Sequence, residues 1–290
     1  GVISEATIKI NKKPEIIEYQ SIIFENFEKG VEFLKDLTFN NSDLIPASIR
    51  LVDNKQLRFA LALKPEKTKW ESIQEYIKNF VVNNYYGFDP FKMVLCTVIY
   101  EGKREEINYK TSMLNKLSYK YGGILGGSEN GRKGYQMTFA IAYIRDFMSQ
   151  LYVIGETFET SVPWNNIRDV CKDVEIQLYE KTKYLNSKPF LSYRITQVYK
   201  TGVCINFMLG FYHKGLNNVT EKFSDLEKQL REAVINAGGS ISHHHGIGKH
   251  RSKFLIKAIE NTQEENILKE FKKQIDPKNI FGINNNIFNR

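Results

Sequence analysis

The sequence predicts an α+β fold in which an antiparallel sheet is covered by helices. Some segments have the short apolar runs of strands, and others have apolar residues at the helical period. They follow one another in β-α-β and β-β-α groups, without the regular strand–helix alternation of a parallel sheet. Two strand-like segments, 193–199 and 203–212, are separated only by Lys200, Thr201 and Gly202, which is typical of an antiparallel hairpin. A content of 42% hydrophobic and 26% charged residues is ordinary for a globular protein.

The first half of the chain supplies strands and helices in turn. Residues 1–10 alternate in hydrophobicity like a strand. The segments that follow are a strand at 18–26, a helix at 26–39, a strand at 46–53, a helix at 70–82, a strand at 92–102 and a helix at 103–121. Gly122 and Gly123 are a typical helix end. The apolar residues of 135–147 follow each other too closely to choose between helix and strand.

The second half places the hairpin between two predicted helices. A long helix is expected within 159–181, with Thr160 or Ser161 as its N-cap and Pro163 near its first turn. After the hairpin, residues 219–239 have the pattern of an amphipathic helix that ends in two glycines. A run of histidines, two further helices and a terminal segment complete the chain.

Charge and cysteine usage restrict the class of protein. A net charge of +8 over 290 residues favours anionic partners, such as phosphate esters or an acidic lipid surface, although the dispersed lysines also fit a solvated surface. The apolar run 93–100 is too short to span a bilayer. Three cysteines without a C-x-x-C pair are too few for a disulfide framework and favour a reducing compartment. Because the chain begins directly on a strand and not on methionine, we expect it to be the C-terminal portion of a longer protein.

The stretch SISHHHGIGKH, residues 240–250, concentrates the histidines of the chain. If it is extended after the helix end, His243 and His245 point to one side and His244 to the other. This alternation, and the lack of an acidic residue nearby in sequence, argue against a metal site. A structural role at a domain seam is the second alternative. The favoured one is proton transfer beside a phosphate cradle, since imidazoles titrate near neutral pH and Lys249 is expected to open a helix whose N-terminal amides favour an anion.

These residues carry a resemblance to a known family. The segment GGSISHHHGIGKHR resembles the histidine-rich segment of alkyldihydroxyacetonephosphate synthase (alkylglycerone-phosphate synthase), a flavoprotein of ether-lipid synthesis. Further stretches match in the same order over essentially the whole chain: GVISEATIKI, PASIRLVDN, ALKP, GFDP, YEGKREE, ENGRKGY, AIAYIRDF, GETFETSVPW, RITQVY and DPKNIFG.

The resemblance implies the C-terminal half of such an enzyme, with the flavin-binding domain absent from this chain. Residues 1–12 would be the last strand of that domain, 13–237 the cap or substrate domain, and 238–290 a C-terminal segment that returns to the active site. The implied reaction exchanges the acyl chain of acyl-dihydroxyacetone phosphate for a long-chain fatty alcohol. FAD would serve as a covalent electrophile at its N5, so that there is no net oxidation. The family is homodimeric, peroxisomal and peripheral to the membrane, and no nucleic-acid partner is expected.

The resemblance also assigns roles to particular residues. His243, His244 and His245 would handle protons, and Arg145 would grip the substrate phosphate. Arg50 matches an activity-critical arginine near the flavin. Lys249 is expected to help hold the substrate anion, and the terminal Asn284, Asn285 and Asn286 would line the site next to the cofactor. No metal is expected.

One position departs from the family pattern. Asn206 aligns with the catalytic tyrosine of the family, and an amide cannot exchange a proton as a phenol does. A second hypothesis is therefore a non-catalytic or split paralogue that acts as a binding or dimerisation module. A third, an FAD-linked 2-hydroxyacid dehydrogenase, ranks last because such enzymes carry a G-E-H-G-x-G pattern in place of SHHHGIG.

Overall fold

The computed structural model describes residues 2–63, 85–259, 262–283 and 288. The helix predicted at 70–82 lies outside the described residues, as do Asn284, Asn285 and Asn286. None of the described helices combines the length and the apolar character needed to cross a bilayer.

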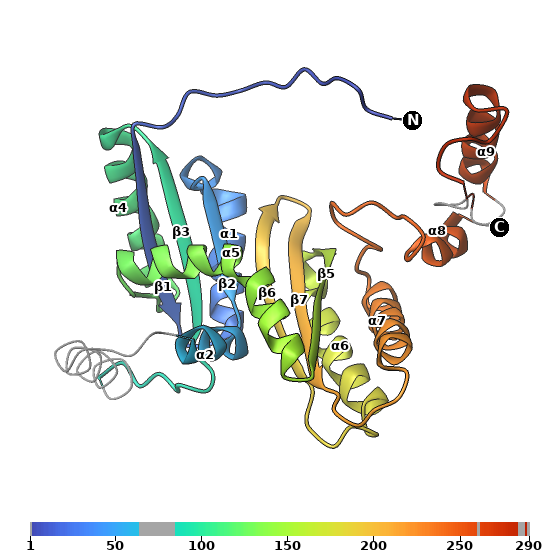
Figure 1. Ribbon diagram of the computed structural model, residues 1–290. Coiled ribbons are helices and arrows are strands. Elements are labelled where there is room, and N and C mark those ends of the chain that lie inside the picture. The colour runs from blue at the N-terminus through green and yellow to red at the C-terminus, as the bar shows by residue number, and fades with distance from the viewer. Residues whose placement is uncertain (1, 64–84, 260–261, 284–287, 289–290) are drawn as a thin grey trace.

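Seven strands of the described chain form one sheet in the order β4-β1-β3-β2-β6-β7-β5 (Figure 1). Every pairing in it is antiparallel, so the predicted fold class is confirmed. The strands are β1 (Ile16–Phe24), β2 (Ser48–Val52), β3 (Val94–Gly102), β4 (Ile124–Leu125), β5 (Val153–Pro163), β6 (Phe190–Tyr199) and β7 (Gly202–Tyr212). The predicted hairpin is the pair β6–β7.

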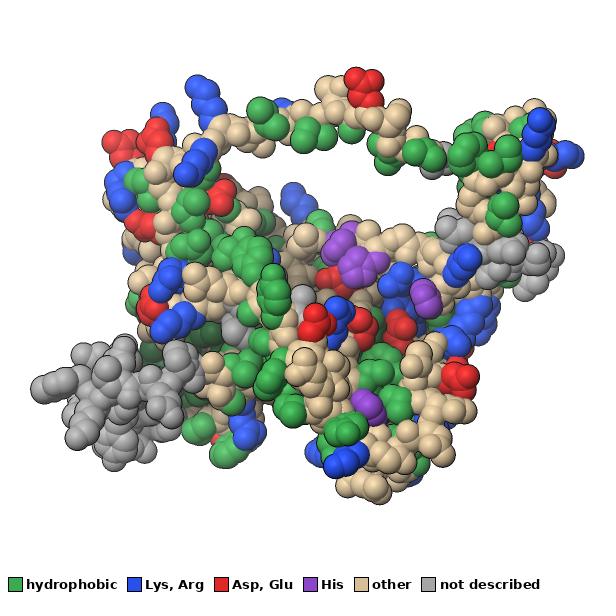
Figure 2. All heavy atoms as spheres, viewed as in Figure 1, with side chains coloured by type: hydrophobic (Ala, Val, Ile, Leu, Met, Phe, Trp, Pro, Cys, Tyr) green, Lys and Arg blue, Asp and Glu red, His purple; other side chains and the backbone are tan. Residues whose placement is uncertain are grey.

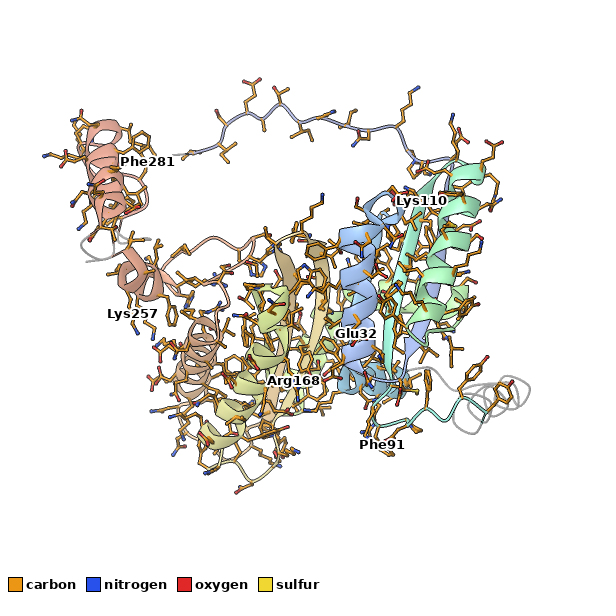
Figure 3. All side chains as sticks on the ribbon, turned by 180° about the vertical axis from the view of Figure 1, so that it is seen from behind. Glu32, Phe91, Lys110, Arg168, Lys257 and Phe281 are labelled. Atoms are coloured by element: carbon orange, nitrogen blue, oxygen red, sulfur yellow. The ribbon has the colours of Figure 1, made fainter. Side chains whose placement is uncertain are left out.

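The two faces of the sheet are covered differently. Four helices pack on one face, as the view from behind shows (Figure 3): α1 (Phe27–Asn40), α4 (Arg104–Lys120), α6 (Ile167–Lys181) and α7 (Val219–Asn236). The other face is crossed by α5 (Ser128–Gln150), and α2 (Asn54–Ala62) closes one end of it. The last helices, α8 (Ser252–Ile259) and α9 (Gln263–Ile275), lie away from the sheet (Figure 1).

Strand alternation puts the hydrophobic core on the four-helix face. On β7, Val203, Ile205 and Phe207 are fully buried toward these helices. The Phe207 ring stacks on Phe158 of the neighbouring β5, with the ring centroids 4.9 Å apart. Because side chains alternate along a strand, the residues between them, such as Asn206, point to the face crossed by α5.

Three local predictions were settled by long-range packing. Residues 135–147 belong to a helix, α5, and not to a strand. The expected N-caps Thr160 and Ser161 are wrong, because these residues pair with β7 as part of β5. The strand continues to Pro163, a short 3-10 turn follows, and α6 begins only at Ile167.

The N-terminal residues 2–14 form no strand or helix in the described structure. Their apolar side chains are exposed: Val2, Ile3, Ile8 and Ile10 have exposed fractions of 82%, 87%, 76% and 82%. The assignment of residues 1–12 to a flavin-binding domain, and the boundaries 13–237 and 238–290, stay predictions.

Candidate functional site

A row of polar side chains crosses the α5 face of the sheet. Arg194 on β6 stands opposite Asn206 on β7, and Asn206 stands opposite Glu159 on β5. Residues directly opposite each other in a sheet point to the same face. Arg50 extends the row on β2, two residues from Val52, which pairs with Arg194. We call Arg50, Arg194, Asn206 and Glu159 the polar row.

The centre of the polar row is a buried contact between Asn206 and Glu159. The Asn206 Nδ2 atom donates to Glu159 Oε1 over 3.0 Å, and the two residues are only 5% and 8% exposed. Within the described chain, the amide oxygen of Asn206 (Oδ1) and the second carboxylate oxygen of Glu159 (Oε2) accept no hydrogen bond. Burying a polar atom without a partner is costly, so this arrangement is typical of a site that binds something.

Hydrogen bonds to β5 fix the start of the histidine segment. The Ser161 N–H donates to Ser240 Oγ and the Ser240 N–H donates to the Ser161 carbonyl, both over 2.9 Å. Thr160 Oγ1 donates to the Ser240 carbonyl over 2.8 Å. Gly239 permits this approach, since a Cβ there would lie only 3.0 Å from Thr160 Oγ1. The buried Arg231 of α7 donates to the Ile241 carbonyl over 2.7 Å and ties the segment to the helix.

The three histidines meet at Glu159. His244 Nδ1 lies 3.0 Å and His245 Nε2 lies 3.8 Å from Glu159 Oε2. The 3.0 Å contact lacks the alignment of a hydrogen bond, so we treat it as an electrostatic contact. His243 Nδ1 and His244 Nδ1 are 2.9 Å apart. The predicted alternation is therefore wrong: the backbone bends through 243–245, and Ser242 Oγ holds the bend by donating to the His245 carbonyl over 2.6 Å.

The argument against a metal site fails for the same reason. Glu159, His243 and His244 each offer a ligand atom, and these atoms lie within 4.8 Å of one another. Two imidazoles and a carboxylate are a ligand set that Zn²⁺ uses in proteins. The acidic partner comes from a strand about 80 residues earlier in the chain and therefore could not be found next to the histidines.

A phenol also reaches this cluster. Tyr199, at the end of β6, donates to Gln197 Oε1 over 2.6 Å, and its hydroxyl lies 3.1 Å from His243 Nε2. Sequence reasoning singled out neither Tyr199 nor Glu159. The register of the hairpin could have placed Tyr199 near the histidines. Tyr199 stands opposite Gly202, and Gly202 stands opposite Pro163, close to the hydrogen bonds between Ser161 and Ser240.

The other end of the polar row borders a cavity of about 50 Å³. Arg50 and Arg194 line it, together with Thr97 of β3 and Met208 of β7. The Arg50 guanidinium lies 5.3 Å from the centre of the Tyr135 ring of α5. Burial lowers the pKa of Arg194 from its ordinary value, and the charge of Arg50 lowers it further. The three histidines do not line this cavity in the described structure.

Two predicted substrate-binding residues lie outside the row. Arg145 is exposed on α5, with Nη1 3.4 Å from Glu156 Oε2 and Nε 3.5 Å from Asp146 Oδ1. Lys249 is also exposed and lies in a turn. The expectation that Lys249 opens a helix is wrong, because α8 starts at Ser252, where the side chain donates to the Lys249 carbonyl over 2.9 Å.

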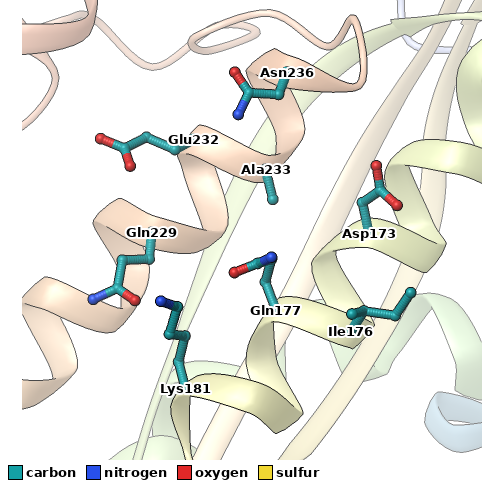
Figure 4. Close-up of a pocket in the computed structure, with 8 residues that line it drawn as sticks. All are labelled: Asp173, Ile176, Gln177, Lys181, Gln229, Glu232, Ala233 and Asn236. Carbon is teal, nitrogen blue, oxygen red and sulfur yellow. The ribbon is translucent and has the colours of Figure 1, made fainter.

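A larger hollow of about 420 Å³ lies between α6 and α7 on the opposite side of the sheet (Figure 4). It is open and mostly polar, with the side chains of Lys181 and Gln229 reaching into it from the two helices (Figure 4). We assign the site to the α5 face instead, where the space-filling view shows histidine side chains gathered beside acidic and basic groups (Figure 2). That face combines titratable groups with buried, unpartnered polar atoms.

Comparison with known proteins gives consistent matches. Residues 13–283 match the family model described as FAD linked oxidases, C-terminal domain. The chain is 39% identical, over 97% of its length, to the alkyldihydroxyacetonephosphate synthase of Caenorhabditis elegans and covers 47% of that protein. It is 26% identical to the synthase of Dictyostelium discoideum, of which it covers 45%. The chain thus spans about half the length of these curated relatives.

Solved structures show the same fold. A structure of alkyldihydroxyacetonephosphate synthase superposes with a TM-score of 0.72 at 21% identity, over 93% of this chain and 45% of that one. The 4-ethylphenol oxidase from Gulosibacter chungangensis superposes with a TM-score of 0.63 at 12% identity, over 93% of this chain and 53% of that one.

Proposed function

Because the chain belongs to the family of FAD-linked oxidase C-terminal domains, we propose that it is the C-terminal half of an alkyldihydroxyacetonephosphate synthase. The resemblance to this enzyme inferred from the sequence is confirmed at 39% identity. The proposed reaction replaces the acyl chain of acyl-dihydroxyacetone phosphate by a fatty alcohol. The proposal includes a homodimer, contact with a membrane surface and a peroxisomal location, as the resemblance implies.

The observation that supports this proposal is the contact of His244 and His245 with the buried carboxylate of Glu159 at one end of the polar row, with His243 beside them. A reaction at the carbon beside a ketone needs a base that accepts a proton near neutral pH, and imidazole is the side chain suited to it. In our proposal His244 and His245 accept and return protons. Glu159 stabilises the imidazolium that forms and orients both rings.

The residues at the centre of the row fit a flavin. Asn206 Oδ1 is a buried acceptor without a partner in the described structure, and the edge of a flavin ring offers an N–H donor for such an atom. Asn206 would thus hold the cofactor, together with Asn284, Asn285 and Asn286 by resemblance. When bound, FAD supplies the electrophilic chemistry of the reaction. Proton transfer is left to this chain.

Cations on the same face hold the substrate phosphate in this proposal. The resemblance assigns this role to Arg145 and places Arg50 nearby, and a guanidinium offers a planar pair of donors to a phosphate. Lys249 adds a positive charge beyond the histidines.

Asn206 supports a second candidate, a non-catalytic paralogue. By the resemblance its buried amide occupies the place of the family's catalytic tyrosine. The amide donates to Glu159, but it cannot exchange a proton as a phenol does. Such a protein would keep the fold and bind a lipid phosphate or a full-length partner. The contact between Tyr199 and His243 favours the enzyme, because it brings a different phenol to the imidazoles.

Joining the chain to a flavin-binding half tests the enzyme against the paralogue. We expect the joined protein to incorporate labelled hexadecanol into acyl-dihydroxyacetone phosphate. A protein that binds FAD and gives no exchange would reject the enzyme and favour the paralogue. Gain of exchange on Asn206→Tyr, with His244→Gln in the same background as the control that loses it, would locate the defect at this position.

A further inference from the structure

Glu159 presents a buried carboxylate oxygen that lacks a hydrogen bond. The residue is 8% exposed, and Asn206 donates to its Oε1 atom over 3.0 Å. Its Oε2 atom accepts no hydrogen bond within the described chain. Burying an anionic oxygen without a donor or a cation costs free energy. The orphaned oxygen therefore points to a ligand beside the histidine side chains, which lie at the molecular surface (Figure 2).

A phenol fixes the tautomer of His243. The single hydroxyl proton of Tyr199 is donated to Gln197 Oε1 over 2.6 Å, so in the 3.1 Å contact between Tyr199 and His243 the Nε2–H of the imidazole is the donor. A neutral imidazole carries one proton. The Nδ1 atom of His243 therefore has a lone pair, and it lies 2.9 Å from His244 Nδ1. Outer partners orient metal-bound histidines in this way.

Three atoms with lone pairs therefore face one position. His244 Nδ1 lies 2.9 Å from His243 Nδ1 and 3.0 Å from Glu159 Oε2. A proton on His244 Nδ1 is donated to His243, and Glu159 Oε2 receives no hydrogen bond. A metal ion in the place of that proton would be bound by all three atoms, with the His244 proton moved to Nε2.

The spacing and the chemistry of these atoms suit a transition metal. Ligands of a tetrahedral Zn²⁺ lie about 2.0–2.2 Å from the ion, and therefore roughly 3.3–3.5 Å from each other. The structure puts ligand atoms of Glu159, His243 and His244 within 4.8 Å of one another. Small rotations of the side chains reach the tetrahedral spacing from there. Imidazole nitrogen favours Zn²⁺ and similar ions over Mg²⁺ and Ca²⁺, which take oxygen ligands.

We propose that Glu159, His243 and His244 form a binding site for a divalent transition metal ion, for which Zn²⁺ is the best match. Three protein ligands leave a fourth position for water, and the ion reaches it from solvent because the His244 side chain is 57% exposed. His245, with Nε2 3.8 Å from Glu159 Oε2, stays outside the three ligands. The site itself does not rest on the proposed function. Its consequence does, because a bound ion occupies a base of that reaction and inhibits the exchange.

Metal binding to the 290-residue chain, prepared without a histidine tag and treated with a chelator, tests the site. We would titrate the chain with Zn²⁺ by calorimetry and with Co²⁺ by visible absorption, since tetrahedral Co²⁺ has intense d–d bands. We expect one ion to bind per chain and Mg²⁺ not to bind. Glu159→Gln keeps the size of the side chain and removes its charge. It should weaken Zn²⁺ binding by about 100-fold or more, because a direct ligand contributes more than the 10–100-fold of an outer partner.

Further variants separate the site from simple chelation by neighbouring histidines. His244→Gln, at an exposed position that the core does not need, should lose Zn²⁺ as Glu159→Gln does. Tyr199→Phe removes the phenol that orients the cluster and should weaken binding about 10-fold. His250→Gln replaces an exposed histidine of the same segment and should leave the affinity unchanged. A synthetic peptide of residues 240–250 keeps the histidines and lacks the carboxylate, so it should bind as weakly as the Glu159→Gln chain.

The outcomes separate this proposal from the proposed function. Equal Zn²⁺ affinity in the unsubstituted chain, in Glu159→Gln and in the peptide would overturn the site, as would equal binding of Mg²⁺. In the protein joined to a flavin-binding half, loss of hexadecanol exchange on adding Zn²⁺, reversed by a chelator, would support both proposals. Zn²⁺ binding that depends on Glu159, in a joined protein that gives no exchange with chelator present, would support the site and reject the synthase. Exchange that continues with the site loaded would reject His244 as a base and leave the site intact.

Discussion

The two faces of the sheet differ in how they use the same strands. On β7, Phe207 points into the four-helix face and stacks on Phe158 with no exposed surface. Its neighbour Asn206 points to the α5 face and holds Glu159. One face is therefore used for apolar packing, and the other carries buried polar groups that make only some of their possible hydrogen bonds. The difference shows that strand alternation, and not separate segments of the chain, divides apolar packing from buried polar groups.

The largest effect is expected on the packed face. Phe207→Ala should lower the free energy of unfolding by about 3–5 kcal/mol, because it removes a fully buried ring and leaves a cavity. Met208→Ala, on the other face of the same strand, should cost clearly less because Met208 is only partly buried. Denaturant unfolding of both variants measures the difference. Equal losses would show that the α5 face is also part of the core.

The next effect concerns catalysis on the polar face. In the protein joined to a flavin-binding half, Glu159→Gln should lower the rate of alcohol exchange by about 10²-fold, the lower end of the usual range for general acid–base catalysis. The amide keeps the size of the side chain and loses the charge beside His244 and His245. Glu232→Gln on α7, whose partner Lys253 is 3.6 Å away, is the matched control. If both variants keep full exchange, Glu159 has no part in proton transfer.

A third effect is expected in the pH dependence of stability. Asp53 at the start of α2 is buried, and burial raises its pKa to about 7. Its pKa in the unfolded chain is about 3.9, so folding takes up a proton between these values, and stability falls as the pH rises from about 4 through 7. We expect a loss of about 4 kcal/mol over this window, since each pKa unit corresponds to about 1.4 kcal/mol.

Asp53→Asn isolates this contribution. Asparagine is an equally good N-cap, so it can keep the 2.8 Å bond that Asp53 accepts from the Gln56 N–H, and it carries no charge at any pH. We would measure the free energy of unfolding of both proteins from pH 4 to 8. The difference between them should therefore be largest at pH 8 and disappear near pH 4. Parallel curves would contradict the raised pKa.

Local patterns predicted much of the fold. The hairpin at Lys200 and Thr201 and the apolar stripe of 219–239 were predicted because turn chemistry and helical period are local signals. The strand β5 was taken for a helix start because Thr160, Ser161 and Pro163 also suit a helix N-terminus. That error concealed Glu159, since only a strand paired with β7 brings its carboxylate to Asn206.

The geometry of the site depends on contacts far apart in sequence. The three histidines were predicted as the reactive group, but the start of their segment is anchored at Ser240, which is held by Ser161 from 79 residues earlier. The neighbourhood of Arg50 and Arg194 follows from β2 lying next to β6, an order that no local pattern encodes. The family itself was predicted correctly, because a series of collinear motifs does not depend on local structure.

The histidine segment is anchored to β5, the edge strand of the sheet, through Ser240 and Ser161. The position of the histidines therefore depends on the register of β5. If β5 slipped by one residue against its neighbour, every side chain would change faces. Phe158 would then lie among the imidazoles, and the Glu159 carboxylate would be driven into the aromatic stack. A slip of β5 therefore cannot move the Glu159 carboxylate away from the histidines without also breaking the Phe158–Phe207 stack, so the packing of the core reports on the register of this strand.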